Sequence, residues 1–205
     1  MKIGIDYSLS SPGVCVNTSD GLANPNTWRD RFSYQDCKFY FLTNTKKYVG
    51  TWKEEVAFGL QSNVEYIGTP HKPYSSEPER YSNIANWVID IINSQYSPHH
   101  VSQKCPIIQI EDYSFGSTGR VFHIAENLGL LKYKLKMECG WDYTLLAPSV
   151  IKKFATDKGN ANKELMLGAF QEDTGVNLGL LLDSSVKSPI TDIADAYFIC
   201  KYEEK

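Results

Sequence analysis

The alternation of apolar and polar residues predicts a short antiparallel hairpin at the start of the chain. Residues 2–6 alternate weakly and end in Asp6, the turn Ser10-Ser11-Pro12-Gly13 follows, and apolar positions resume at 14–16. Short runs of period two that are separated by Ser, Pro and Gly are typical of paired strands. The aromatic run 38–43 predicts a third strand. Residues 44–75 mix polar and aromatic positions and indicate only loops with short strands.

Helical spacing becomes frequent after residue 75. Ser76 and Glu79 have the spacing of a capping box, and apolar residues recur every three or four positions after them, so we predict a helix over about 77–94. The short apolar run 107–110 predicts a strand that is covered on both faces of the sheet. The other elements that the pattern predicts are a helix over 121–138 closed by Gly140, a strand over 143–146, short helices near 149–155 and 161–172, and a last helix from about Ile190.

This order of elements predicts an α/β fold. An antiparallel hairpin followed by alternating strands and helices favours a mixed sheet with helices packed on it. The length of 205 residues fits one domain, and no repeat or Pro/Gly-rich stretch marks a boundary within 1–205. We therefore expect a single domain.

Composition restricts the setting of the protein. The 42% apolar residues are typical of a globular protein, and no apolar run is long enough for a signal peptide or membrane span. Five widely spaced cysteines without a C-x-x-C pair argue against a disulfide framework or zinc ribbon. The expected setting is the cytoplasm, without membrane attachment. The net charge of −3 does not favour nucleic-acid binding, although acids gathered in a metal site would lower this sum.

Four acidic residues stand where a sheet could gather them. Asp6 ends the first strand, Glu111 ends the buried strand, and Asp192 and Asp195 are three residues apart on one face of the last helix. Each acid alone is as well explained by a surface carboxylate, and Asp192 by the favourable dipole of a helix N-terminus. Together, beside apolar positions, they need a positive partner. Mg²⁺ is suited to this role because it binds oxygen ligands and keeps several waters, and two such ions can promote phosphodiester hydrolysis.

Several short motifs resemble those of the RuvC-type Holliday junction resolvases of the RNase H-like superfamily. They occur in the family's order across nearly the whole chain: Ile3-Gly4-Ile5-Asp6, Ile110-Glu111, Pro148-Ser149-Val150-Ile151-Lys152, Gly159-Asn160-Ala161-Asn162-Lys163 and Asp192-Ile193-Ala194-Asp195-Ala196. The resemblance implies an RNase H-like fold, a homodimer, and Mg²⁺-dependent cutting of four-way DNA junctions, with Mn²⁺ as a substitute. It assigns the metal to Asp6, Glu111, Asp192 and Asp195, and gives Lys152 and Lys163 phosphate contacts, with Lys163 also assisting catalysis.

The chain also departs from the bacterial pattern of this family. Tyr7-Ser8 stands where a glycine is usual after the first Asp, and Asp112 replaces a glutamine. Segment 44–75 resembles an insertion relative to the compact bacterial form. These departures fit a divergent branch such as those of phages or large DNA viruses, which would place the protein in the host cytoplasm. They also imply cleavage of several kinds of branched DNA.

Further residues are candidates for contact with DNA or with a second subunit. Arg120 could track phosphates with Lys152, Lys153, Lys158 and Lys163, although clustered lysines are also common on a solvated helix face. Tyr113 and Phe115 could stack on a base, or pack over the sheet as ordinary loop aromatics. The family dimerises through the helix 121–138, where Phe122, Leu130 and Tyr133 either face a partner or fill the core.

Two alternatives to a nuclease remain open at this stage. One is a non-catalytic protein that binds branched DNA on the same fold, although such a role would not require all four acids. The other is an ATPase of the sugar-kinase or actin-like kind, whose first strand can also read I-G-I-D. That class needs a second, glycine-rich phosphate loop and usually a longer chain with two lobes.

Overall fold

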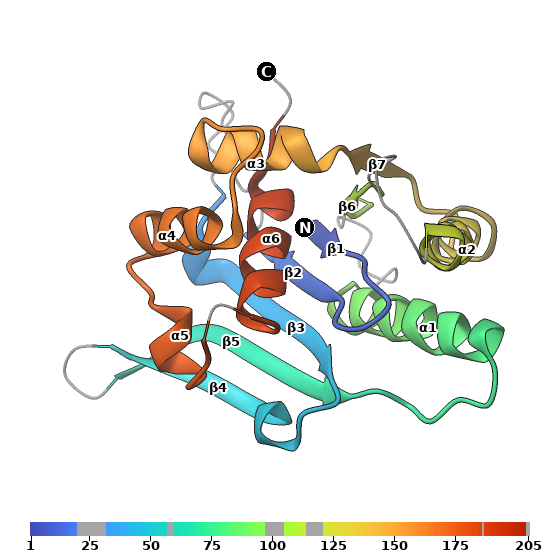
Figure 1. The fold of residues 1–205 in the computed structure, drawn as a ribbon, viewed down its shortest axis with the longest axis horizontal. Coiled ribbons are helices and arrows are strands. Elements are labelled where there is room, and N and C mark those ends of the chain that lie inside the picture. Colours follow the sequence, from blue (N-terminus) through green and yellow to red (C-terminus); the bar gives the residue numbers. More distant parts are fainter. Residues whose placement is uncertain (20–31, 57–59, 97–104, 114–120, 186, 204–205) are drawn as a thin grey trace.

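The structure is a computed structural model that describes residues 1–19, 32–56, 60–96, 105–113, 121–185 and 187–203. Seven strands form one sheet in the order β4-β5-β3-β2-β1-β6-β7 (Figure 1). Helices pack on both faces of this sheet. All five cysteines are free, as predicted, and Cys15, Cys37 and Cys200 are buried. In the described part of the chain no helix is long and apolar enough to span a membrane.

The centre of the sheet has the predicted topology. β1 (Lys2–Asp6) pairs antiparallel with β2 (Gly13–Asn17), which pairs antiparallel with β3 (Cys37–Thr43). On the other side of β1, β6 (Ile107–Glu111) and β7 (Tyr143–Leu146) run parallel to it. This mixed sheet with its antiparallel N-terminal hairpin and flanking helices confirms the predicted α/β fold class.

The prediction of loops and short strands over 44–75 was wrong. After the 3₁₀ turn η2 (Lys46–Tyr48), β4 (Gly50–Val56) and the long β5 (Leu60–Pro70) form a hairpin that widens the sheet beyond β3. The inward positions of β5 do alternate, as Ser62, Val64, Tyr66 and Gly68, and all four are buried. Ser62 and Gly68 have no large apolar side chain, so the alternation of apolar and polar residues that marks a strand is not visible in the sequence here.

The helices on one face of the sheet match their predicted positions closely. α1 (Glu77–Gln95) begins at Ser76, whose side chain accepts a hydrogen bond from the backbone N–H of Glu79. α2 (Val121–Tyr133) packs beside it and continues into the π-helical turn η4 (Lys134–Glu138), so the predicted helix keeps its length but changes its winding. Gly140 follows with a φ of +70°, which glycine adopts at little cost.

The other face of the sheet carries the C-terminal helices. α3 (Pro148–Thr156) and α4 (Lys163–Thr174) pack against α6 (Ile190–Lys201), which lies on β1 and β2. The short helix α5 (Leu178–Leu181) lies between α4 and α6 in the sequence. The apolar core is therefore split into two layers by the sheet. One layer joins β3 and α4 to α6, and the other joins β1 and β6 to α1 and α2.

The predicted dimer residues on α2 divide between the core and the surface. Leu130 packs against the apolar core, which is one of the two roles that the sequence left open for it. Phe122 and Tyr133 are 78% and 57% exposed, and Met137 on η4 is 69% exposed. These three residues, which we call the α2 surface, leave an apolar stripe on the outside of the molecule.

α6 lies in direct backbone contact with the central hairpin because two glycines leave room for it. A Cβ atom on Gly4 would lie 2.2 Å from the backbone N of Cys200 and 2.3 Å from the carbonyl oxygen of Ala196. A Cβ atom on Gly13 would lie 2.6 Å from the carbonyl oxygen of Asp192. The glycine of the motif Ile3-Gly4-Ile5-Asp6 is thus explained by its close packing against α6.

We expect Gly4→Ala to destabilise the fold strongly. Because the atoms in the way belong to backbone, α6 must move, and the loss in the free energy of unfolding should reach at least about 3 kcal/mol, the upper end for overpacking. Chemical denaturation measures this change. Gly168→Ala on α4, where an added Cβ meets nothing within 4 Å, is the control and should stabilise by roughly 0.5–1 kcal/mol. Equal effects of the two substitutions would contradict the proposed close contact.

Candidate metal centre

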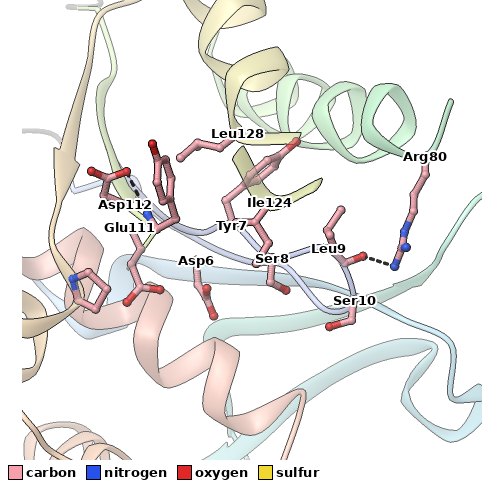
Figure 2. Close-up of a pocket in the computed structure, with 12 residues that line it drawn as sticks. Asp6, Tyr7, Ser8, Leu9, Ser10, Arg80, Glu111, Asp112, Ile124 and Leu128 are labelled. Carbon is pink, nitrogen blue, oxygen red and sulfur yellow. Dashed lines mark hydrogen bonds between the residues drawn. The ribbon is translucent and has the colours of Figure 1, made fainter. Parts of the chain in front are cut away.

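The fold brings the four predicted acids to one end of the sheet. β1 and β6 are parallel neighbours, with Ile5 opposite Ile110, so Asp6 and Glu111 lie side by side at their carboxyl ends. Their side chains point to the same side in Figure 2. α6 places Asp192 in its first turn, over Gly13 at the start of β2, and Asp195 on the same helix face. The joint placement predicted from the sequence is therefore present.

Burial and mutual repulsion both raise the pKa values of this acidic cluster. For Asp6 burial is the largest cause, followed by the negative charges of Glu111, Asp192 and Asp195. A hydrogen bond between the carboxyl groups of Asp6 and Glu111 raises the pKa of Asp6 further and lowers that of Glu111. A bound cation would favour the charged form of both acids.

The two acids of α6 differ in their surroundings. Burial, together with the charges of Glu111 and Asp192, raises the pKa of Asp195 to about 7. Burial also raises the pKa of Asp192, but hydrogen bonds oppose this rise. The Ser188 hydroxyl donates to Asp192 Oδ2 at 2.5 Å, and Ser11 on the β1–β2 loop forms a second hydrogen bond with the same carboxylate. Asp192 is thus held in place by its neighbours, whereas Asp195 is held mainly by packing.

These two serines are site residues that sequence reasoning missed. Ser11 belongs to the Ser-rich turn after Asp6, and Ser188 precedes Asp192 by four residues. Their signal in the sequence was weak because the side chain of a serine beside a turn or a helix start usually forms a hydrogen bond with the nearby backbone. Only the fold shows that both side chains meet one carboxylate.

Two of the predicted lysines face the acidic cluster. The charge of Lys152 on α3 lowers the pKa values of Glu111 and Asp195, and that of Lys163, the first residue of α4, lowers those of Asp192 and Asp195. Lys153 and Lys158 are exposed on α3 and the loop after it. The net effect on each acid is still a raised pKa, so two lysines do not compensate four buried carboxylates.

The donor set of this cluster fits a hard divalent cation. All four acids offer carboxylate oxygens, which Mg²⁺ prefers, and Mg²⁺ needs few protein ligands because it retains waters. Among the described residues no three His, Cys, Asp or Glu side chains converge into a preformed metal cage. The raised pKa values of these carboxyl groups show that positive charge here is favourable.

A cavity opens beside the acids. It has a volume of about 430 Å³ and lies between the β1–β2 loop, α1 and α2 (Figure 2). Asp6 and Glu111 line one end of it and Arg80 lines the other. Tyr113, a predicted DNA contact, is among its lining residues and also packs against the core. The other two predicted contacts of that loop, Phe115 and Arg120, lie outside the described residues.

Comparisons with known proteins give similarity at the level of structure only. The sequence matches no family model and no curated protein. Two solved structures are similar to it, each with a TM-score of 0.49. One is Thermus thermophilus RuvC, at 16% identity over 97% of this chain and 89% of that one. The other is T. thermophilus RuvC in complex with a Holliday junction substrate, at 14% identity over 98% and 91%.

We expect the metal-free protein to lose stability as the pH rises. The pKa of Asp195 is near 3.8 when unfolded and about 7 when folded, so its contribution is complete below about pH 4 and is lost as the pH rises through 7. Asp195→Asn removes this loss and should stabilise the metal-free protein at pH 7.5 by roughly 1–3 kcal/mol. Thermal melts between pH 5 and 8 measure it, with Asp90→Asn on the exposed side of α1 as the matched control. A destabilised D195N protein would contradict the assignment.

Proposed function

We propose that this protein is a Mg²⁺-dependent nuclease that cuts branched DNA by hydrolysis of a phosphodiester. The observation that carries the proposal is the cluster of four carboxylates on β1, β6 and α6. Burial raises the pKa of all four, and neighbouring acids raise those of Asp6, Glu111 and Asp195 further. Such a cluster destabilises the protein unless it holds positive charge, and therefore indicates a role beyond folding.

Each residue of the cluster has a distinct task in this proposal. Asp6 and Glu111 hold the cations from the rigid centre of the sheet, and Asp195 binds from the facing helix. Asp192, which Ser11 and Ser188 fix in place, binds directly or orients the attacking water. Bound divalent cations, up to two per site, supply an activated water and stabilise charge on the phosphate. Mn²⁺ should replace Mg²⁺, since it accepts the same oxygen ligands.

Lysines would guide the DNA onto this cluster. Lys152 and Lys163 lie near enough to the acids to affect their pKa values, so a phosphate bound between the cations and these lysines would have positive charge on two sides. Lys163 is the nearer candidate for stabilising charge during the reaction, because both acids of α6 respond to it. Lys153 and Lys158 extend the positive surface outward, and Tyr113 with Phe115 and Arg120 would complete the contact to DNA.

The choice of branched DNA as substrate rests on the order of the sequence motifs. A four-way junction has two-fold symmetry, and a symmetric pair of active sites could cut two of its strands. The α2 surface offers a place for the second subunit to bind, because Phe122, Tyr133 and Met137 expose apolar area to solvent there. We include the homodimer in the proposal for this reason.

Replacing Asp6 with Asn or Glu111 with Gln should abolish Mg²⁺-dependent cleavage of a synthetic four-way junction. Both changes remove a cation-binding charge, and losses of at least roughly 10³-fold in rate are expected. Binding to the junction in Ca²⁺ should remain, because the lysines are unchanged. The D90N protein serves as the control and should cleave normally.

The panel of substrates should also contain flap, duplex and single-stranded DNA. Unaltered cleavage by D6N would disprove the proposed centre. Tight binding by the unmodified protein without any product, in Mg²⁺ and in Mn²⁺, would instead favour a protein that binds branched DNA without catalysis.

We expect Tyr133→Glu to weaken self-association. A charge in the middle of the α2 surface would be desolvated in a dimer but not in a monomer, so the dissociation constant should rise by at least tenfold, or about 1.4 kcal/mol. Sedimentation equilibrium measures this. Leu180→Glu, at an apolar residue of α5 that is 82% exposed, is the control and should have no effect. A Y133E protein that associates like the unmodified protein would exclude this surface as the interface.

A further inference from the structure

The cavity beside the acidic cluster has walls of three different kinds. Asp6 and Glu111 form its acidic end, and Leu9, Ile124 and Leu128 provide an apolar wall from the β1–β2 loop and α2. Figure 2 shows Arg80 reaching in from α1 toward the backbone of Leu9 at the opposite end. A volume of about 430 Å³ lies within the range of roughly 300–1,000 Å³ that is usual for small-ligand sites.

Arg80 is a mostly buried cation with unused hydrogen-bonding capacity. Its side chain is 12% exposed, its Nη2 donates to the carbonyl oxygen of Leu9 at 2.8 Å, and its Nη1 lies 3.6 Å from the exposed carboxylate of Glu77. Among the described residues, no acceptor lies within hydrogen-bonding distance of its Nε. A guanidinium has five N–H donors, so these contacts leave donors for an anion such as a phosphate.

The position of Arg80 places this positive charge close to the proposed site of cleavage. It binds Leu9, and the three residues from Asp6 to Leu9 span at most about 11 Å. Successive phosphates of one strand rise roughly 3.4 Å along a duplex. A phosphate near Arg80 therefore belongs to a nucleotide within about three steps of the scissile bond, and the apolar wall lies between the two.

We propose that this cavity holds one unpaired nucleotide of the strand that is cut, with its base against Leu9, Ile124 and Leu128 and its phosphate toward Arg80. The proposal rests on the proposed nuclease function and deepens it. A base that is stacked and paired in a duplex cannot turn into a cavity beside the active site, and the energy needed to extrude a base is lowest where it is already unpaired. Branched DNA offers such bases at its branch point, so the cavity would select branched DNA over duplex through shape and not through sequence.

A substitution that fills the cavity tests this proposal. Ile124→Trp should reduce cleavage of the four-way junction by at least tenfold, because the indole occupies the space of the base. Leu130→Trp, at a half-buried position of the same helix outside the cavity, is the control for stability and should cleave normally. The increase in melting temperature on addition of Mg²⁺ should be the same in both variants.

A modified substrate shows whether I124W loses activity because the indole fills the cavity or because the substitution disturbs the fold. An abasic nucleotide at a single position beside the cleavage site should restore cleavage by I124W at least tenfold, because removing the base makes room for the indole. Rescue at no position, or cleavage by I124W equal to that of the unmodified protein, would overturn the proposal. If the unmodified protein cuts no DNA, the nuclease function fails and this proposal with it, which is a distinguishable result.

A second measurement does not depend on the variant. A junction that carries 2-aminopurine at successive positions near the cleavage site should, when bound by the unmodified protein in Ca²⁺, gain fluorescence at one position where the base leaves the stack. Arg80→Gln should weaken that gain by at least threefold at saturating protein. Fluorescence that is unchanged at every position would overturn the proposal.

Discussion

The close contact of α6 with the central hairpin is the constraint on which the site depends. Gly4 and Gly13 let the helix backbone approach the strands more closely than any side chain would permit. This approach brings Asp192 and Asp195 over the carboxyl ends of β1 and β6, where Asp6 and Glu111 already lie. Any residue larger than glycine at position 4 must push the helix away, so the packing of the core and the geometry of the acids are set by the same contact.

The acidic cluster opposes the stability that this packing provides. Desolvation raises the pKa of all four carboxyl groups, and the charges of neighbouring acids raise those of Asp6, Glu111 and Asp195 further. The charges of Lys152 and Lys163 act in the opposite direction but do not cancel the rise. A divalent cation bound here would relieve the repulsion, so the stability of the fold should depend on both pH and metal concentration.

Much of this arrangement could be predicted from the sequence, because the relevant signals are local. Asp6 and Glu111 follow apolar strands, Asp192 and Asp195 share a helix face, and Ser76 caps α1 as its spacing indicates. Signals that depend on distant residues were lost. β5 was missed because Ser62 and Gly68 occupy inward positions. The role of Leu130 stayed open because helical spacing alone does not say which side of a helix meets the core. Arg80, Ser11 and Ser188 reach their partners only through the fold.

The central claim is that Asp6, Glu111, Asp192 and Asp195 bind a divalent metal between the sheet and α6. Anomalous X-ray diffraction from crystals soaked in Mn²⁺ tests this claim most directly, because the signal locates the ion without reference to activity. The account predicts one or two anomalous peaks within about 2–2.5 Å of carboxylate oxygens of this cluster. Absence of any peak there at saturating Mn²⁺, or peaks confined to other surface carboxylates, would contradict it.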